Sequence, residues 1–214
     1  LCMGAFVARD HHKLGTFIDR CYKWGYFIRT EDQVLAEASK KQIESPSPCS
    51  GNSGGVSLDT ASSDCISIMW CGRFLKWKHP ELAVLLAQRL KGRNVPFRLK
   101  LYGDGALRAK MEQAVGKLGL ENVVAFHGNV SNVQVREAMK SADIFVFTSD
   151  RQEGWGAVAG ESLSCGCALV ASEDIGSVPY LIKEGYNGLI FRGPSPYSSM
   201  KNPDMRSLED LEQK

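Results

Sequence analysis

The chain has 214 residues, of which 43% are hydrophobic, and a formal net charge of +2. The hydrophobic content is enough for one good core. So small a net charge argues against binding to nucleic acid or anionic membranes by bulk electrostatics. The sequence contains no apolar run near the length that crosses a bilayer, and its start lacks the basic region of a signal peptide. Because it does not begin with Met, we expect a fragment or a processed chain.

The first 44 residues are predicted to be a helical remnant of an N-terminal domain, with helix over about residues 12 to 43 and a break near Gly25. Aromatic and basic side chains are interleaved there, which leaves two interpretations open. The segment is either a helix on a membrane surface or an element that needs a partner domain to bury its aromatic side chains. The second is preferred, because so short a piece has no independent core. Residues 45–64, rich in Ser, Pro, Gly and Asn, are predicted to be a linker.

From residue 65 to 192, short apolar runs alternate with segments of helical periodicity. The predicted strands are 66–70, 97–102, 123–126, 143–148, 167–171 and 188–191. The predicted helices are 79–91, 107–118, 131–142, 157–164 and 178–183, with Ser131 and Gln134 as a capping box. This alternation predicts an α/β fold, a Rossmann-like parallel sheet with right-handed crossovers. Residues 193–214 form a polar tail that we expect to be truncated.

The chain has seven cysteines, an odd number without regular spacing, which favours a reducing cytoplasm over a secreted setting. Cys165 and Cys167 could be metal ligands. The preferred interpretation is two small apolar fillers at a helix end and a strand start, because no second ligand pair follows at zinc spacing. The sequence therefore predicts a cytoplasmic protein without a metal site.

Arg73 and Lys78 follow the first predicted strand of the sheet, in a loop at its carboxyl edge. Two cations there would neutralise a diphosphate, Arg through a bidentate fork and Lys as a point charge. Alone, they would be interpreted as solvated loop charges. Gly103 and Asp104 follow the next strand and either bring backbone close to a nucleotide base or form an ordinary tight turn. His127, after the third strand, is interpreted as structural.

Glu153 and Glu161 flank a run of very small residues between a predicted strand and a predicted helix. The residues of interest between them are Gly154, Trp155, Gly156 and Ala157. An ionised carboxylate accepts hydrogen bonds from neighbouring ring hydroxyls, and tiny residues let a ligand reach backbone N–H groups. Parallel sheets bind ligands at this edge, and helix N-termini attract phosphate. The run predicts a polyol site beside a phosphate site, and it makes the diphosphate interpretation of Arg73 and Lys78 the preferred one.

In their order and spacing, these motifs resemble the C-terminal, donor-binding domain of retaining glycosyltransferases of family 4, which has the GT-B fold. The resemblance runs from Ile66 to Phe191. Its carriers are Gly72-Arg73 with Lys78, Tyr102 to Leu107, Phe126-His127-Gly128, Ser141 to Val146, the two glutamates, and Gly185 to Phe191. It implies that Arg73 and Lys78 bind the diphosphate of a nucleotide-sugar donor, that Glu153 contacts the donor hexose, and that Glu161 contacts the ribose hydroxyls.

The resemblance further implies hexose transfer with retention at the anomeric carbon, no required cofactor and no obligatory metal. The cations and the helix terminus would stabilise the leaving diphosphate, with the backbone at Gly154 to Ala157 near the sugar and phosphate. The sequence departs from the family at three positions. His79 stands where Gly is usual, Trp155 where Phe is usual and Tyr180 where Glu is common, so the identity of the sugar is not readable.

The family's N-terminal domain supplies the acceptor site, and we expect this chain to hold at most its last segment. The fragment is therefore expected to be inactive alone, with an unidentified acceptor and no nucleic-acid partner. A peripheral place at the inner face of the membrane stays open. Two alternatives also stay open: a GT-B sugar epimerase that works by elimination, and a non-catalytic nucleotide-sugar binding module. The paired glutamates favour transfer over epimerisation.

Overall fold

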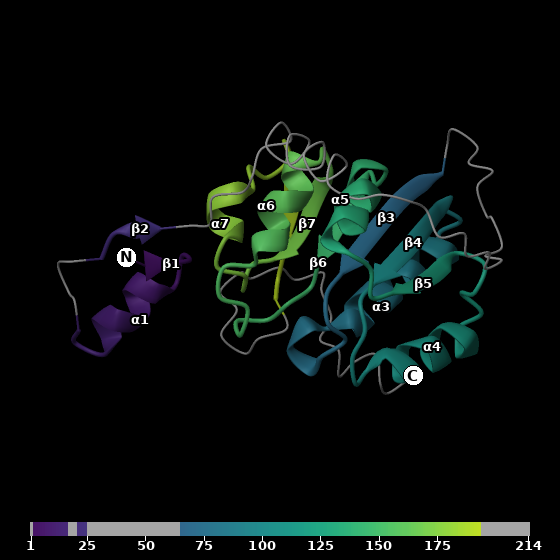
Figure 1. Cartoon of the computed structure of the whole chain (residues 1–214), viewed down its shortest axis with the longest axis horizontal. Helices are drawn as coiled ribbons and strands as arrows, with labels where there is room; N and C mark the ends of the chain where they lie inside the picture. The colour runs from purple at the N-terminus through teal and green to yellow at the C-terminus, as the bar shows by residue number, and fades with distance from the viewer. Residues whose placement is uncertain (1, 17–20, 25–64, 194–214) are drawn as a thin grey trace, which may run out of the picture.

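The computed structural model describes residues 2–16, 21–24 and 65–193, and six parallel strands form its main sheet (Figure 1). The strands are β3 (Ile66–Cys71), β4 (Phe97–Tyr102), β5 (Val124–Gly128), β6 (Ile144–Phe147), β7 (Ala168–Ser172) and β8 (Gly188–Phe191). Their order across the sheet is β5-β4-β3-β6-β7-β8, so the chain builds outward from β3 and then returns to its other side. The predicted Rossmann-like parallel sheet is confirmed.

The central strands β3 and β6 are buried on both faces, which explains their near-continuous apolar sequences, whereas β4 alternates apolar residues with Arg98 and Lys100. The helical elements after them are η1 (Lys76–Lys78), α3 (Pro80–Gly92), α4 (Arg108–Lys117), α5 (Asn132–Lys140), α6 (Ala157–Ser164) and α7 (Val178–Leu181). Alternate residues of β3 enter two separate cores. Ile68 and Trp70 pack in the core that contains α3 and α4, whereas Met69 packs in the core that contains α5, α6 and α7. Helices therefore cover both faces of the sheet.

The observed elements follow the predicted ones closely, with strand ends that differ by at most two residues. The capping box of α5 is present, since Ser131 Oγ accepts from the Gln134 N–H and the Gln134 side chain accepts from the Ser131 N–H. Helix α7 ends at Leu181, before the predicted end at residue 183. The Asn187 side chain donates to the Leu181 carbonyl at 2.9 Å and accepts from the Lys183 N–H at 2.8 Å, which diverts the backbone from a further turn.

The N-terminal piece, drawn in purple in Figure 1, is not the single helical segment that the sequence predicted. It contains β1 (Cys2–Met3), α1 (Val7–Lys13) and β2 (Lys23–Trp24). The prediction of helix is wrong at Lys23–Trp24, because these residues pair in parallel with Cys2–Met3, a partner that local sequence does not reveal. Residues 25–43, the linker at 45–64 and nearly all of the tail lie outside the described residues. Among the described helices, none is long and apolar enough to cross a membrane.

Helix α6 begins at a glycine that is pressed against the core. Gly156 has φ 74, and a Cβ built there would lie 2.6 Å from Cε1 of Phe147 and 3.0 Å from Cγ2 of Ile175. Phe147 is the last residue of β6, and both side chains are fully or almost fully buried. The N-terminus of α6 is therefore held directly at the carboxyl end of β6.

We expect Gly156→Ala to lower the free energy of unfolding by about 2–5 kcal/mol, because the new methyl adds overpacking to an unfavourable positive φ. Gly166→Ala is the matched control, since Gly166 has φ 94 but no atom within 4 Å of the place that an alanine methyl would take. It should lose only about 1–2 kcal/mol, the conformational part. Urea unfolding followed by circular dichroism measures both. Equal losses in the two variants would contradict the packing argument.

Candidate functional site

The loops after β3 and β4 lie side by side at the carboxyl edge of the sheet. The Gly72 N–H donates to the Tyr102 carbonyl at 3.1 Å, and the Phe74 N–H donates to the Asp104 carbonyl at 2.9 Å. Gly103 has φ 114, and a Cβ there would strike the carbonyl oxygen of Gly72. Gly103 and Asp104 thus border the loop that carries Arg73, as expected for loops that follow neighbouring parallel strands.

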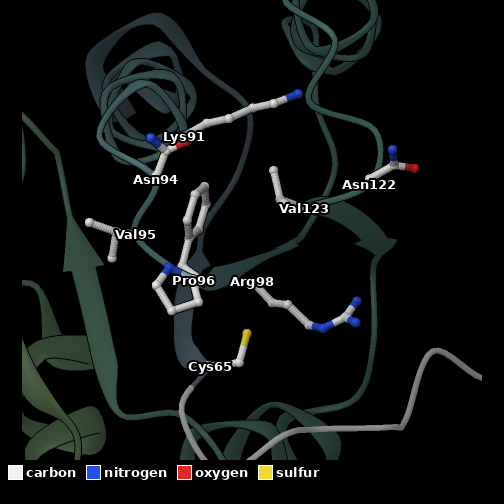
Figure 2. Close-up of a pocket in the computed structure, with 9 residues that line it drawn as sticks. Cys65, Lys91, Asn94, Val95, Pro96, Arg98, Asn122 and Val123 are labelled. Atoms are coloured by element: carbon white, nitrogen blue, oxygen red, sulfur yellow. The ribbon is translucent and has the colours of Figure 1, made fainter.

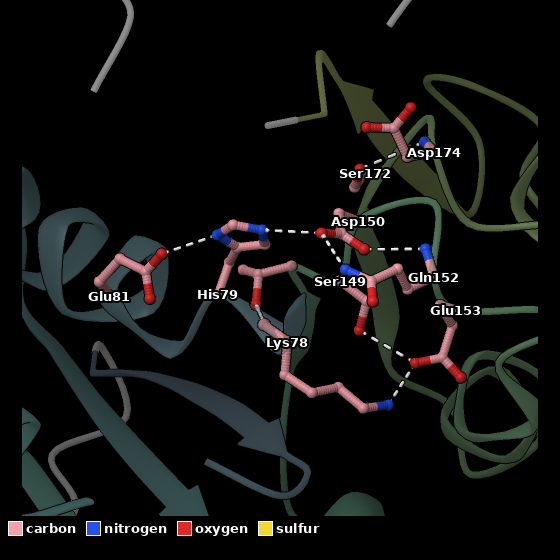
Figure 3. A network of polar contacts seen from close by, with 10 residues as sticks. Lys78, His79, Glu81, Ser149, Asp150, Gln152, Glu153, Ser172 and Asp174 are labelled. Carbon is pink, nitrogen blue, oxygen red and sulfur yellow. Dashed lines mark hydrogen bonds and ion pairs between the residues drawn. The ribbon is translucent and has the colours of Figure 1, made fainter. Parts of the chain in front are cut away.

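Lys78 and Glu153 contact each other directly, although they come from loops after different strands (Figure 3). The Lys78 ammonium is paired with Glu153 Oε2, and each side chain is only 14% exposed. Ser149 Oγ donates to the same carboxylate oxygen at 3.1 Å. The ammonium also lies 4.4 Å from the ring centroid of Trp77 and 5.6 Å from that of Phe147, within cation–π range. The structure therefore joins two of the predicted site residues in one half-buried contact.

Glu161 lies at the same edge, since its charge acts on the pKa of the Cys71 thiol at the end of β3. The pKa of Cys71 is raised to about 11, mainly by burial and then by the negative charge of Glu161, while the positive charge of Lys78 partly offsets both. Cys71 ends β3, so the carboxylate of Glu161 and the ammonium of Lys78 both act on a single point at the strand end. This thiol stays neutral at physiological pH.

Arg73 is exposed, and within residues 2–16, 21–24 and 65–193 we find no ion pair or hydrogen bond to its guanidinium. It shares the loop with Lys78 but does not converge on the same carboxylate. The N-terminus of α6 and the Lys78 ammonium both lie against the Phe147 ring, and at this N-terminus the N-cap Gly156 offers no side chain and the first turn has no acidic residue. Its backbone N–H groups and partial positive charge are available to an anion. The edge thus combines a guanidinium, a helix N-terminus and two glutamates.

Trp155 and Tyr180, two of the departures from the family pattern, are in contact with each other. Their rings stack with centroids 6.0 Å apart and an interplanar angle of 22°. The Trp155 carbonyl accepts from the Ser177 N–H at 3.1 Å, which ties the glutamate loop to the start of α7. Gly154, between Glu153 and Trp155, is exposed. The aromatic pair therefore forms one wall beside the glutamate loop.

Sequence reasoning missed the polar residues that hold these loops together. The Trp70 indole N–H donates to Thr148 Oγ1 at 2.9 Å, and Thr148 Oγ1 donates to the Lys78 carbonyl at 2.6 Å. The Asp150 N–H donates to the Trp77 carbonyl at 2.9 Å. The available signal was the polar run Thr148-Ser149-Asp150 directly after a buried strand. Thr148 and Ser149 are fully buried, and together these bonds fasten the Lys78 loop to the end of β6.

The N-terminal piece contacts the glutamate loop. The Ala5 N–H donates to the Gly176 carbonyl at 2.9 Å. The Arg151 guanidinium lies 4.3 Å from the ring centroid of Phe6, and its Nη2 lies 3.4 Å from Asp10 Oδ1. The segment before the linker and the loop that presents Glu153 are therefore in direct contact.

A cavity of about 370 Å³ lies at the opposite edge of the sheet (Figure 2). It is bordered by Lys91, Asn94, Arg98 and Asn122 and by the Cys65 thiol, all near the amino ends of the strands. None of the predicted site residues lines it, so it is separate from the edge that carries Lys78 and Glu153. Within the described part of the chain, no group of three or more His, Cys, Asp or Glu side chains is placed to hold a metal ion.

Comparison with known proteins identifies relatives of the sheet domain. The family model for glycosyl transferases group 1 matches residues 62–202. An uncharacterized glycosyltransferase of Methanocaldococcus jannaschii is 33% identical over 104 residues, which cover 49% of this chain and 29% of that protein. A D-inositol 3-phosphate glycosyltransferase of Arthrobacter sp. is 28% identical over 130 residues, covering 59% of this chain and 30% of the relative. The chain spans only about a third of these relatives' lengths.

Solved structures agree on the fold. Anabaena HepE, in complex with UDP and glucose, superposes with a TM-score of 0.59 at 16% identity and covers 90% of this chain and 48% of its own. The C-terminal domain of a glycosyl transferase group 1 family protein (LpcC) from Francisella tularensis superposes with a TM-score of 0.53 at 25% identity, covering 61% of this chain and 69% of its own. Both carry the parallel sheet described above.

We expect Thr148→Val to lower the free energy of unfolding by about 1–3 kcal/mol, because the isosteric change leaves the buried Trp70 N–H without an acceptor. The matched control is Ser141→Ala, which removes an exposed hydroxyl that donates to the Ala138 carbonyl at 2.9 Å. This control should lose no more than about 0.5 kcal/mol. Urea unfolding measures both, and a Thr148→Val protein as stable as the control would show that the buried link contributes nothing.

Proposed function

The chain belongs to the glycosyl transferases group 1 family, and on that premise we propose that it is the donor-binding half of a retaining glycosyltransferase. It binds a nucleotide-diphosphate sugar and positions the hexose for transfer to an acceptor. The observation that carries the proposal is the contact of Lys78 with Glu153 at the edge that also holds Glu161. A cation for phosphate and two acceptor-only carboxylates for ring hydroxyls stand together there.

In this proposal the Lys78–Glu153 pair is the resting state of the donor site. A diphosphate that enters the site takes over the ammonium of Lys78 and is also bound by Arg73. Glu153 is then released toward the hydroxyls of the hexose, while Glu161 accepts hydrogen bonds from the ribose. Backbone N–H groups from Gly154 to Ala157 lie close to the sugar and phosphate, and Gly103 and Asp104 border the nucleoside.

Catalysis follows from the same charges. Negative charge accumulates on the diphosphate as its bond to the anomeric carbon breaks, and groups aimed at that charge lower the barrier. Arg73, Lys78 and the N-terminus of α6 supply this stabilisation with side chains and backbone alone. The proposed transfer retains the anomeric configuration and uses no cofactor or metal ion. The catalytic roles are therefore proposed for Arg73, Lys78 and Glu153.

The structural neighbours guide the choice of donor. Anabaena HepE has been solved with UDP and glucose, and the pneumococcal O-GlcNAc transferase GtfA with UDP and GlcNAc. We infer that UDP-sugars are the first donors to test. The curated relatives are about three times as long as the stretch they share with this chain. We propose that the acceptor site lies on an N-terminal domain of which residues 1–44 are the last segment, and that the 214 residues alone transfer no sugar. We place the protein in the cytoplasm.

Titration calorimetry with UDP, GDP and ADP tests the diphosphate contact. We expect one of them to bind, and Arg73→Ala to weaken its binding by about 10- to 150-fold, equivalent to about 1.5–3 kcal/mol for a hydrogen-bonded charge. Stability should not change, because Arg73 is exposed. Arg93→Ala is the control, since Arg93 is an exposed cation at the end of α3 on the opposite edge. The proposal fails if no nucleotide binds the folded protein, or if the two variants bind equally well.

The ribose role of Glu161 can be tested with a matched pair of ligands. The wild type should bind the preferred nucleotide about 5- to 30-fold more tightly than its 2′-deoxy form, because a carboxylate gains a charged hydrogen bond from the 2′-hydroxyl. In Glu161→Gln this ratio should fall to about twofold. Glu121→Gln, at an exposed glutamate before β5, should keep the wild-type ratio. An unchanged ratio in Glu161→Gln would remove Glu161 from the ribose site.

A further inference from the structure

His79, the residue after Lys78, has a backbone conformation that is unusual for a side chain of its size. It is the N-cap of α3 with φ 46 and ψ 54, in the left-handed region. Such a conformation is sterically unfavourable for L-residues, because it brings Cβ close to the following carbonyl oxygen. Asn94, at the other end of α3, is the one other non-glycine residue of the described part of the chain with positive φ. Asparagine and histidine are both enriched in this region among non-glycine residues, so what distinguishes His79 is the set of contacts that its ring makes.

The His79 ring contacts two carboxylates, one at each nitrogen of the imidazole (Figure 3). Nδ1 lies 2.7 Å from Glu81 Oε1, and Nε2 lies 3.3 Å from Asp150 Oδ2. The His79 side chain is 15% exposed. Carboxylate oxygens only accept hydrogen bonds, so both nitrogens satisfy their partners only when both carry a proton. Both hydrogen bonds of the His79 ring are therefore present only in its imidazolium form.

The surrounding charges favour the same form. Burial opposes the charge on His79, but hydrogen bonds and charges from Glu81, and then from Asp150, outweigh it and raise its pKa above the usual value of 6.5. Glu81 faces the ring from α3 and Asp150 from the loop after β6. The neighbouring cations are already paired, Lys78 with Glu153 and Arg151 with Asp10. The net field at the ring is negative.

Asp150 connects this imidazole to the glutamate loop. Its Oδ1 accepts from the Gln152 N–H at 2.8 Å, and its carbonyl accepts from the Glu153 N–H at 3.0 Å. Asp150 thus organises the turn that presents Glu153. His79 is bonded to that turn on one side and follows Lys78 directly on the other, so it links the two partners of the ion pair, together with the Asp150 N–H bond to the Trp77 carbonyl.

We propose that His79 is a positioning residue whose imidazolium form clamps the 150–153 turn to the start of α3, and so sets the geometry of Lys78 and Glu153. The clamp is intact while the ring is doubly protonated. As the pH rises through the folded-state pKa, one N–H is lost, one carboxylate loses its donor and the turn is released. The consequence for donor binding rests on the proposed function, whereas the clamp itself does not.

The clamp is tested without any ligand. Two measurements are compared between about pH 6 and about pH 8.5: the titration of the His79 ring by NMR, and the hydrogen-exchange protection of the Gln152 and Glu153 amides, corrected for intrinsic exchange rates. In the wild type the ring should titrate above 6.5, and protection should fall about 5- to 20-fold with rising pH. In His79→Gly, which suits the left-handed backbone and should fold, protection should be low throughout.

Asn94→Gly is the matched control, because it makes the same backbone change at a positive φ without touching the carboxylates. It should keep the wild-type pH dependence. Asp150→Asn should lower the pKa of His79 by removing a negative charge. The clamp is overturned if His79 titrates as a free imidazole, or if His79→Gly keeps a pH-dependent protection like that of the wild type.

The effect on the donor site is tested with UDP-glucose, whose diphosphate diester keeps its charge across this pH range. Wild-type affinity should fall about 3- to 10-fold as the pH rises, while His79→Gly should bind equally at both pH values. Failure of UDP-glucose to bind any variant would count against the proposed donor, and the ligand-free exchange result would still decide the clamp. A pH dependence that persists in His79→Gly would show that another group controls binding.

Discussion

The half-buried ion pair of Lys78 and Glu153 is the contact that the carboxyl edge of this sheet is built around. A pair withdrawn this far from water is stable only when its remaining hydrogen-bonding positions are filled. Ser149 fills one position on the carboxylate, and the Trp77 ring faces the ammonium. Removing either partner alone would leave a charge in a poorly solvated place. The two charges of the site therefore neutralise each other. A ligand replaces this pair without leaving a charge unpaired only if it brings a negative charge for Lys78 and hydroxyls for Glu153.

The pair also depends on bonds that carry no charge. Thr148 Oγ1 accepts a hydrogen bond from the Trp70 indole N–H and donates one to the Lys78 carbonyl, so a core residue of β3 and the end of β6 hold the same loop. Gly156 brings the start of α6 against Phe147, a ring that also lies near the Lys78 ammonium. The rigidity of the sheet is thus transmitted to the site through buried hydroxyls and a close glycine contact, whereas Arg73 stays exposed at the rim.

The sequence predicted the features that depend on the character of a strand itself or on interactions between residues close together in the chain. Strands buried on both faces leave apolar runs, and the α5 capping box is a short-range pattern, so both were found in the structure. The edge loops were grouped correctly because parallel strands share one carboxyl edge. The sequence did not predict which side chains from distant parts of the chain pair with each other. Lys78–Glu153, Trp70–Thr148 and His79–Asp150 each join residues more than seventy positions apart. The same limit explains the error at Lys23–Trp24, whose strand partner lies at Cys2–Met3.

The positions where this chain departs from the family pattern have partners in the structure. Trp155 stacks on Tyr180, and His79 lies between Glu81 and Asp150. Glycine after the lysine takes the left-handed conformation at little cost and makes no side-chain bond to the glutamate loop, which the Asp150 N–H bond to the Trp77 carbonyl would still hold. Histidine takes the same conformation and places its ring between two carboxylates, both of which accept hydrogen bonds from the ring when it is charged. Histidine at this position therefore adds a contact that depends on the charge of its ring. This contact lies directly beside Lys78, the cation that the donor diphosphate is proposed to bind.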